Sequence, residues 1–391
     1  MIGGRDSLAE HFAAAVPASG AGRLHMAAHS HHPWPDVTRQ AHLRAWEVAA
    51  QHLDDKWVTV LEGELPRAQQ HVAIRLGLTE PANVVFAQNT HELLVRICSA
   101  LPLPMRVLTT DAEFHSAARQ LQRWAEAGWA VIDRVPAEPM ESFSERFVAA
   151  MRPEHDLVLL SHVFYNSGYV VPDVARVVAS VPDERTYVVV DGYHAFMALP
   201  TSVLAIQDRA FYLAGGYKYA MAGEGACFAT VPPGYAQRPV NTGWFAAYST
   251  LADGVGPGGQ VPFPLDGQRL AGSTFDPSGL FRFNAVQDWL HGLGVDVAQI
   301  HTHVAGLQQV FRTALEQRPG VLADAELLPG QEHERGHFLT YRTEAAGNIA
   351  RELARRQIVV DHRGDRLRFG FGVYHDAGDV QRLAQALGDI T

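Results

Sequence analysis

The sequence is poor in cysteine, which narrows the classes of protein it can encode. Only Cys98 and Cys227 occur among 391 residues. A chain of this length with one possible pair is not a disulfide-stabilised scaffold, and a reducing, cytoplasmic location is expected. The first twenty residues carry Asp6 and Glu10 and contain no uninterrupted apolar segment, so no secretory signal peptide is expected.

Long apolar runs and concentrated positive charge are also missing. No apolar stretch approaches the roughly 20 residues needed to cross a bilayer. The formal net charge is −10, and no basic stripe is present, which makes nucleic acid and anionic membranes poor candidate partners. No internal repeat is visible. The composition, 47% hydrophobic and 19% charged, is that of a globular protein, and the length favours two closely associated domains.

The apolar pattern predicts an α/β fold. Helical spacing runs from about residue 37 to 77, and short apolar runs then alternate with helix-like stretches. Runs that are apolar at every position suit strands buried on both faces, and their alternation with helices predicts a mostly parallel sheet covered by helices. The predicted strands are residues 83–87, 106–110, 130–132, 157–160, 187–190 and 210–213, with 226–231 pairing antiparallel.

The C-terminal third predicts a smaller α+β domain. Gly- and Pro-rich sequence between residues 253 and 272 shows no clear element and is predicted to be a long loop. The elements predicted beyond it are helices at 285–317, 348–357 and 379–388 and strands at 337–343, 358–363 and 367–373. We therefore expect an N-terminal segment (1–60) packed with the small domain, a large cofactor-binding domain (61–265) and a small domain (266–391).

Two polar residues after predicted strands suggest a cofactor site, because ligands of open α/β sheets bind beyond the carboxyl ends of the strands. Asp191 ends one apolar run, and Lys218 follows another within the segment GGYKY. An apolar setting lowers the pKa of a lysine towards nucleophilic use, and glycines let the backbone approach a ligand. Asp191 alone is equally well explained as a turn or N-cap residue. Pyridoxal 5'-phosphate (PLP), however, requires an amine for its aldehyde and an acid facing its pyridine nitrogen.

A phosphate site is predicted where residues 83–87 lead directly into a helix. Asn89 and Glu92 have the spacing of a capping box, which marks the helix start. The free N–H groups and the helix dipole at that point favour a phosphate, with the Thr90 hydroxyl as a further donor. An ordinary capped helix is the alternative at any single junction of this kind.

These residues resemble the class V aminotransferase group of PLP-dependent enzymes, and within it kynureninase. The most specific match is GYKY at residues 216–219, which resembles the motif around the cofactor lysine. The segments DGYH (191–194), SHVFYNSG (161–168), RPVNTGWF (238–245), DHR (361–363) and LRF (367–369) match in the order of the family. The resemblance runs from about residue 23 to the end and implies the PLP-dependent transferase fold of aspartate aminotransferase.

The resemblance also implies roles for individual residues. Lys218 would form a Schiff base with the cofactor and later move protons, Asp191 would pair with the pyridinium nitrogen, and Tyr217 and His194 would assist. Arg368 would clamp a substrate carboxylate, a task suited to its planar fork, with a surface salt bridge as the alternative. The remaining cofactor contacts would come from Asn89, Thr90, Phe114 (His115 as second choice, for ring stacking), Tyr165, Trp244 and Thr274.

The segment that would choose the substrate departs from the kynureninase pattern. The usual GNSLG opening is replaced by AHSHHP at residues 28–33, which keeps only Ser30. A loop that lines the active-site mouth, with Ser30 and His31 near substrate, is expected. The histidines at 25, 29, 31 and 32 lack a Cys or carboxylate at zinc-like spacing, so no metal site is expected.

The expected function is a kynureninase-like hydrolase that cleaves the Cβ–Cγ bond of L-kynurenine or a related γ-keto amino acid, a step of tryptophan catabolism. An aminotransferase or another PLP-dependent β-lyase is the alternative, and a non-catalytic PLP-fold binding protein is a more distant one. Cysteine desulfurase is disfavoured because no cysteine follows Cys227 to serve as the thiol nucleophile of the smaller domain. Family analogy implies a homodimer with the active site at the interface.

Overall fold

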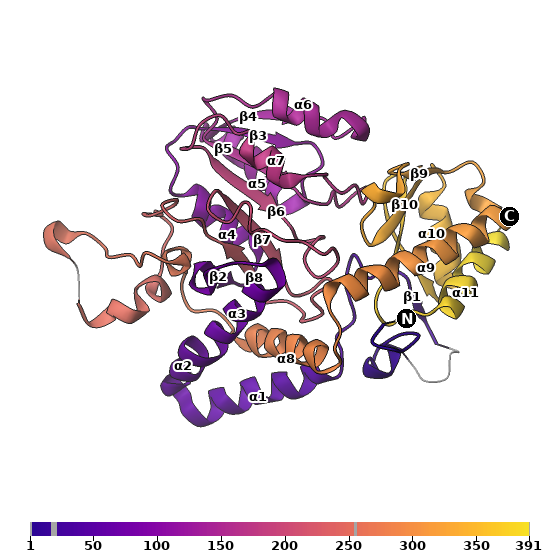
Figure 1. Cartoon of the computed structure of the whole chain (residues 1–391), viewed down its shortest axis with the longest axis horizontal. Helices are drawn as coiled ribbons and strands as arrows, with labels where there is room; N and C mark the ends of the chain where they lie inside the picture. Colours follow the sequence, from indigo (N-terminus) through magenta and orange to yellow (C-terminus); the bar gives the residue numbers. More distant parts are fainter. Residues whose placement is uncertain (1, 17–21, 254–255, 391) are drawn as a thin grey trace.

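A computed structural model, which describes residues 2–16, 22–253 and 256–390, shows a large central sheet in the order β2-β8-β7-β6-β5-β3-β4 (Figure 1). Its strands are β2 (Val84–Ala87), β3 (Met105–Thr110), β4 (Ala130–Val135), β5 (Leu157–Ser161), β6 (Tyr187–Asp191), β7 (Ala210–Gly215) and β8 (Cys227–Thr230). Strands β3 to β7 run parallel, and β8 is antiparallel to both of its neighbours. The predicted strands and their mostly parallel arrangement are confirmed.

Both faces of this sheet are buried, as the uniformly apolar runs predict. Val188 and Val190 of β6 belong to one hydrophobic cluster, and Val189 between them belongs to another. This division follows from the alternation of side chains along a strand. The edge strand β4 is the exception, because Val131 is 53% exposed.

Helices cover the sheet, and a further group of helices packs beside β2 and β8 at one end of it (Figure 1). Those of the sheet body are α4 (Thr90–Cys98), α5 (His115–Glu126), α6 (Phe143–Ala149) and α7 (Val174–Ala179). Those beside β2 and β8 are α1 (Val37–His52), α2 (Lys56–Val58), a π-helical stretch (Thr59–Glu64), α3 (Leu65–Leu76) and α8 (Ser278–Gly292). Short 3-10 turns occur at Ala9–His11, Leu53–Asp55, Pro81–Asn83, Met140–Ser142, Trp244–Asp253, Gly320–Leu322 and Glu332–Glu334. Within the described residues, no helix is both long and apolar enough to span a membrane.

A second, smaller α+β body holds the C-terminal part of the chain (Figure 1). Its antiparallel sheet has the order β12-β13-β10-β9, built from β9 (Glu326–Leu328), β10 (Phe338–Arg342), β12 (Asp361–Arg363) and β13 (Arg366–Gly370). Its helices are α9 (Val297–Gln317), α10 (Ala346–Arg355) and α11 (Ala377–Gly388). The N-terminal segment joins it through β1 (Leu24–His25), which pairs with β11 (Ile358–Val359). The division at residues 60 and 265 stays a prediction.

Three details of the C-terminal prediction were wrong. The helix predicted at 285–317 is two helices, because the chain turns after Gly292 and α9 begins with its own capping box at Asp296 and Gln299. The strand predicted at 358–363 is split into β11 and β12, which join different sheets. The loop predicted between residues 253 and 272 contains short 3-10 turns, Pro257–Gly259 and Gly267–Leu270, while residues 254 and 255 lie outside the described part.

A histidine cluster, formed where the N-terminal segment packs against Tyr374 and His375, should make the stability of the fold sensitive to acid. His25 bonds the Tyr374 hydroxyl at 2.8 Å, the His375 Nε2 lies 2.7 Å from the His25 carbonyl, and the ring of His32 packs edge-on against Tyr374. Burial lowers the pKa of His25 to about 4 and the pKa values of His32 and His375 to about 3. These side chains are therefore neutral in the folded protein at neutral pH.

The free energy of unfolding should fall as the pH drops below about 6.5, where unfolded histidines gain protons and the folded ones do not. Each buried histidine contributes about 1.4 kcal/mol per pH unit until its own folded pKa is reached. Urea unfolding at pH 7.5, 6 and 5 measures this slope, and the exposed His333, replaced by glutamine, is the control that leaves it unchanged. Equal stability at pH 7.5 and 5 would contradict the prediction.

Candidate active site

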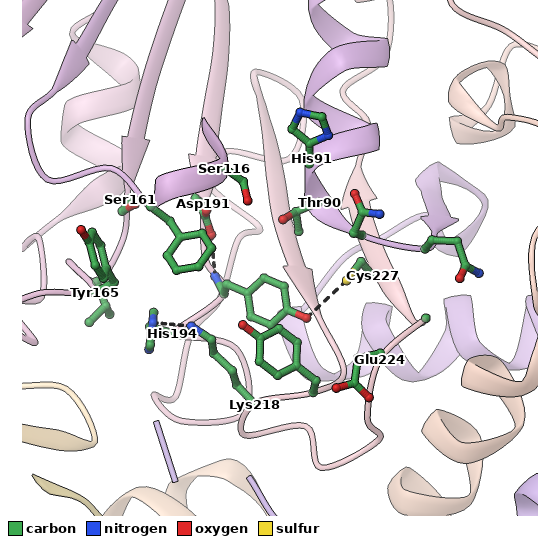
Figure 2. A pocket seen from close by; sticks show the side chains of 17 residues that line it. Thr90, His91, Ser116, Ser161, Tyr165, Asp191, His194, Lys218, Glu224 and Cys227 are labelled. Atoms are coloured by element: carbon green, nitrogen blue, oxygen red, sulfur yellow. Dashed lines mark hydrogen bonds between the residues drawn. The ribbon is translucent and has the colours of Figure 1, made fainter. Parts of the chain in front are cut away.

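A cavity with about 850 Å³ of empty space, part of it open to solvent, lies at the carboxyl ends of β5 and β6 (Figure 2). Ser161 ends β5, Asp191 ends β6, and Lys218 follows β7 after a short loop. The parallel register places Ser161 beside Asp191. The other lining residues are Gln88, Asn89, Thr90, His91, Phe114, Ser116, Val163, Tyr165, Tyr193, His194, Tyr217, Glu224, Gly225 and Cys227.

The amine of Lys218 lies inside this cavity, and the side chain is only 5% exposed. Its Nζ lies 2.5 Å from His194 Nε2 and between 5.3 and 5.6 Å from the ring centroids of Phe114, Tyr193 and Tyr217. Burial, assisted by the charge of Arg368 and opposed by that of Asp191, lowers the pKa of Lys218 to about 7. A substantial fraction of this amine is therefore unprotonated and nucleophilic at neutral pH.

The glycines before Lys218 are required by protein contacts. A Cβ at Gly215 would lie 2.4 Å from the Cys227 sulfur, and one at Gly216 would lie 2.9 Å from the Gly223 carbonyl oxygen. Gly223 has a φ of +71°, and a Cβ there would overlap the Trp34 ring. The glycines expected to let the backbone approach a ligand instead let the lysine loop pack against its neighbours.

Asp191 presents its carboxylate to the cavity from the end of β6. Its Oδ1 accepts a hydrogen bond from the Tyr193 backbone N–H at 2.9 Å, which fixes the side chain. Burial raises the pKa of Asp191, while the positive charge of Lys218 lowers it. The side chain is thus placed to hold a proton on a partner such as a ring nitrogen, because a shared proton relieves the cost of burying the charge.

His194 links the lysine to the second body of the chain. Its Nε2 faces Lys218, its Nδ1 has no hydrogen-bond partner among the described residues, and its ring lies 5.5 Å from that of Phe338 on β10. Burial, together with the charges of Lys218 and Arg368, lowers the pKa of His194 far below its ordinary value. A neutral imidazole next to an amine can accept or return a proton.

The N-terminus of α4 opens into the same cavity, as the phosphate prediction requires. Asn89 is the N-cap, and its Oδ1 accepts a hydrogen bond from the Glu92 N–H at 2.9 Å. Asn89, Thr90 and His91 all line the cavity, so unpaired N–H groups and the positive end of the helix dipole face it. This is a suitable site for a phosphate group.

Two substitutions at Asn89 separate its capping role from phosphate binding. Asn89→Ala should lower the free energy of unfolding by about 1 kcal/mol because the cap is lost. Asn89→Asp keeps the cap and should keep the stability, but its negative charge should weaken PLP binding by the apoprotein. Urea unfolding and PLP titration measure the two effects. Native PLP affinity in Asn89→Asp would argue against a phosphate at this helix end.

Arg368 is buried at the border between the two bodies. It lies on β13 opposite Asp361 of β12, and it is 3% exposed. Its guanidinium donates to an Asp361 carboxylate oxygen and to the backbone carbonyl of Tyr165, a residue that lines the cavity. The structure thus shows Arg368 in a buried ion pair, where the sequence alternatives were a substrate clamp or a surface salt bridge.

The structure does not bring every predicted site residue into the cavity. His115 contacts Phe114 and Tyr165 but is not among the lining residues, which favours Phe114 as the stacking ring. His31 lies near the mouth, with its ring centroid 5.9 Å from that of Tyr217, and Ser30 precedes it. The last two predicted residues, Trp244 and Thr274, hydrogen-bond to each other at 2.8 Å away from the cavity.

Glu113 is a buried residue next to the site that sequence reasoning missed. Its carboxylate accepts hydrogen bonds from the Ser161 N–H and hydroxyl, at 3.1 and 2.7 Å, and from the Thr110 hydroxyl at 2.7 Å. Burial raises the pKa of Glu113 to about 7 despite these donors, with a further contribution from Asp191. It holds Ser161 beside Asp191. Its position three residues after the end of a predicted strand was the available signal.

Both cysteines are buried, as expected, and Cys227 also lines the cavity. The Tyr193 hydroxyl and the Cys227 sulfur lie 3.3 Å apart (Figure 2). Burial raises the pKa of Cys98 to about 12 and that of Cys227 to about 11, so neither is a thiolate at neutral pH. The chain therefore offers no activated thiol near Lys218 for persulfide formation.

The N-terminal histidines have separate partners. His29 stacks on Phe338, His31 faces Glu224, and His32 bonds the Pro33 carbonyl. In the part of the chain that the structure describes, no group of three or more His, Cys, Asp or Glu is arranged to hold a metal ion. The residues around Lys218 instead suit PLP: a nucleophilic amine, a buried carboxylate, an aromatic ring and a helix N-terminus surround one cavity (Figure 2).

Comparison with known proteins gives matches along the chain. Residues 300–387 match the family described as the kynureninase C-terminal domain. A probable cysteine desulfurase from Vibrio cholerae serotype O1 is 24% identical over 336 residues, which cover 82% of this chain and 81% of the relative. An isopenicillin N epimerase from Streptomyces clavuligerus is 26% identical over 376 residues, which cover 87% of this chain and 89% of the relative.

Solved structures share the fold over nearly the whole chain. A C-DES variant with glycine covalently linked to its PLP cofactor has a TM-score of 0.80 at 15% identity, covering 98% of this chain and 99% of that one. The cystine C–S lyase C-DES in complex with cysteine persulfide also has a TM-score of 0.80, at 16% identity, covering 94% of this chain and 98% of that one. The cysteine desulfurase CsdA from Escherichia coli has a TM-score of 0.75 at 17% identity, covering 97% of this chain and 96% of that one. The predicted α/β fold of PLP-dependent transferases is confirmed.

Proposed function

We propose that this chain is a PLP-dependent enzyme of the class V group, in which Lys218 binds the cofactor covalently and an amino acid is the substrate. The single observation that carries the proposal is the buried Lys218 amine, whose pKa is lowered to about 7, facing the same cavity as Asp191 and the start of α4. PLP supplies an electron sink that stabilises a carbanion at the substrate Cα. The matches with class V enzymes support the same assignment.

The side chains of the cavity divide the remaining work. Asp191 would keep a proton on the pyridine nitrogen of PLP, Phe114 would cover the ring, and Asn89 and Thr90 at the start of α4 would hold the phosphate. With the cofactor bound, Lys218 would serve as the base for the substrate Cα proton, and His194, whose Nε2 lies 2.5 Å from Lys218 Nζ, is placed to share that proton. Burial raises the pKa of Tyr217 to about 12, so its hydroxyl is protonated and acts as a proton donor.

Within this class we propose kynureninase-like cleavage of a γ-keto amino acid as the reaction. The match of residues 300–387 to the kynureninase C-terminal domain supports it, since this segment carries Arg368, which donates a hydrogen bond to the backbone carbonyl of the cavity residue Tyr165. Aromatic rings at Phe114, Tyr165 and Tyr217 suit a substrate with an aromatic ketone. Tyr217 would donate the proton that Cβ requires after the acyl group has left as a carboxylic acid.

Elimination at a C–S bond is the second candidate. The cystine C–S lyase C-DES shares the fold over 94% of this chain with a TM-score of 0.80. Elimination uses the same lysine and no protein thiol, which agrees with the buried, protonated Cys98 and Cys227. Transfer of sulfur to a protein cysteine, by contrast, lacks its nucleophile here.

Product analysis separates these reactions. PLP-loaded protein is incubated without any keto-acid acceptor, in parallel with L-kynurenine, its ring-hydroxylated derivative and L-cystine. Release of an aromatic acid with alanine supports hydrolysis, and release of pyruvate, ammonia and persulfide supports elimination. Turnover that requires a keto acid would identify an aminotransferase. The absence of all three would contradict the proposed chemistry, with Lys218→Ala as the negative control.

The expected homodimer remains a prediction, and two residues bear on it. Trp244 and Thr274 would contact the cofactor according to the family resemblance, yet they lie away from the cavity of their own chain. We propose that they serve the site of a second copy. Loss of PLP affinity in Thr274→Ala, without loss of dimer formation in sedimentation, is the expected result.

A further inference from the structure

His29 is a buried polar side chain that the proposed chemistry leaves unused. It is fully buried, and neither ring nitrogen has a hydrogen-bond partner among the described residues. Its ring stacks on Phe338 at 4.5 Å, and Gly370 makes room for it, because a Cβ there would lie 2.2 Å from His29 Nδ1. Burying a polar group without a partner costs about 1–3 kcal/mol, so such a group calls for an explanation.

One carboxylate lies between His29 and Arg368. The Asp361 Oδ2 accepts a hydrogen bond from Arg368 Nη2 and lies 3.7 Å from His29 Nε2. The second distance is too long for a hydrogen bond, but a small rotation of the Asp361 side chain would close it. Arg368 Nε is also buried and has no hydrogen-bond partner in the described part of the chain. The Asp361 carboxylate thus has two alternative partners, Arg368 and His29, and the His29 ring makes no hydrogen bond among the described residues.

The charges around His29 explain why it is neutral at rest. The groups that face it are Arg368 on β13, Asp361 on β12, His194 and Lys218 in the loops after β6 and β7, and His25 on β1. Burial first, and then the positive charge of Arg368, lower the pKa of His29 far below its ordinary value. Neutralising Arg368 and bringing Asp361 into contact would both act in the opposite direction.

We propose that a substrate carboxylate binding to Arg368 displaces Asp361, which then pairs with His29, and that His29 takes up one proton from solvent. The inference rests on the proposed function, because it requires Arg368 to be the carboxylate subsite. Charge is balanced throughout. At rest Arg368 and Asp361 cancel and His29 is neutral; when the substrate carboxylate is bound, two carboxylates face the guanidinium and the protonated imidazole. The buried site carries no net charge in either state, which avoids the cost of an uncompensated ion.

The proposal makes carboxylate binding dependent on pH. If one whole proton is taken up, the Kd for a carboxylate rises about tenfold per pH unit while His29 is neutral in the free protein and protonated in the complex. Asp361 acts as a positioning residue that holds Arg368 extended before substrate arrives. His29 pairs with the displaced Asp361 carboxylate once the substrate carboxylate is bound to Arg368.

Calorimetry with an unreactive carboxylate tests the exchange. The probe is β-benzoylpropionate, a γ-keto acid without the amine that would react at the cofactor. The PLP-loaded protein is titrated in buffers of different ionisation enthalpy, which reports the protons taken up. We expect uptake of about one proton in the native protein. His29→Gln, which cannot be protonated, should take up none and bind with a Kd independent of pH.

Two further variants complete the design. Asp361→Asn should bind the probe more tightly and without proton uptake, because Arg368 is no longer held by a charged partner. His362→Gln, at an exposed neighbouring position, is the matched control and should behave like the native protein. If His29→Gln fails to fold, His29→Asn and the proton count of Asp361→Asn carry the test.

Proton uptake that persists in His29→Gln, or binding without uptake in the native protein, would overturn the exchange. Native protein that does not bind the probe would overturn it as well, since Arg368 would then hold no carboxylate. None of these three outcomes affects the covalent attachment of PLP to Lys218, which is measured separately. The failure of this inference is therefore distinguishable from the failure of the proposed function.

Discussion

Replacing Lys218 by alanine is expected to abolish turnover, with a loss of at least about 10⁴-fold in kcat, because nucleophile and proton carrier are removed together. The amine is buried in the cavity beside His194, and no other lysine lies near it, since the chain has only one more, Lys56. PLP should also dissociate from Lys218→Ala on gel filtration, while the native protein retains it.

Lys56 provides the matched control for this experiment. It lies on α2, with its amine 4.9 Å from the ring centroid of Trp57 and outside the cavity. Lys56→Ala should keep native turnover and cofactor retention. Native activity in Lys218→Ala, at any substrate that the native protein converts, would rule out the role assigned to this lysine.

Replacing Asp191 by asparagine is expected to cause the second large loss of kcat. The substitution keeps the size of the side chain and the acceptor for the Tyr193 N–H, but it removes the charge that would hold a proton on the pyridine nitrogen. We expect kcat to fall by about 10²–10⁴-fold, the range typical of a group that controls a proton in the transition state. Stability should be preserved or improved, because a half-buried carboxylate whose pKa is raised by desolvation is removed.

Steady-state kinetics and urea unfolding together check this prediction. Asp208→Asn, at an exposed position on the loop before β7, is the control and should leave both unchanged. A loss of activity in Asp191→Asn that accompanies loss of the folded state would indicate a structural role. Full activity in the folded variant would contradict the assignment of Asp191.

The sequence predicted the large sheet well because its signal is local. Val188, Val189 and Val190 are all buried, and a run of β-branched residues on both faces has few alternatives to a central parallel strand. The start of α4 was equally predictable, since Asn89 caps a helix whose apolar residues begin four positions later, at Leu93. The two polar residues that follow strands, Asp191 and Lys218, then meet at one edge of the sheet because parallel strands end together.

The residues that sequence reasoning missed depend on contacts between distant segments. Glu113 follows β3, and its role appears only when β5 places Ser161 against it, 48 positions later in the chain. His29 becomes notable only when Gly370 and Phe338 of the small body close around its ring. Neither pairing leaves a periodic signal. The break between α8 and α9, in contrast, left a local signal in the sequence, because Gly294 and the N-cap residue Asp296 follow α8 closely.

The arrangement also shows why the two bodies act together. The cavity is built by the large sheet, yet Arg368, Asp361 and Phe338 approach it from the small sheet, and His194 contacts both Lys218 and Phe338. The proposed carboxylate site on one body and the proposed cofactor lysine on the other would therefore be joined through buried side chains. The His29–Asp361 exchange would make this junction responsive to the substrate carboxylate.

Borohydride reduction of PLP-saturated protein, followed by peptide mass spectrometry, tests the central claim most directly. With only two lysines in the chain, the result is unambiguous: we expect a pyridoxyl group on Lys218 and an unmodified Lys56. Unmodified Lys218 in protein saturated with PLP would contradict the account.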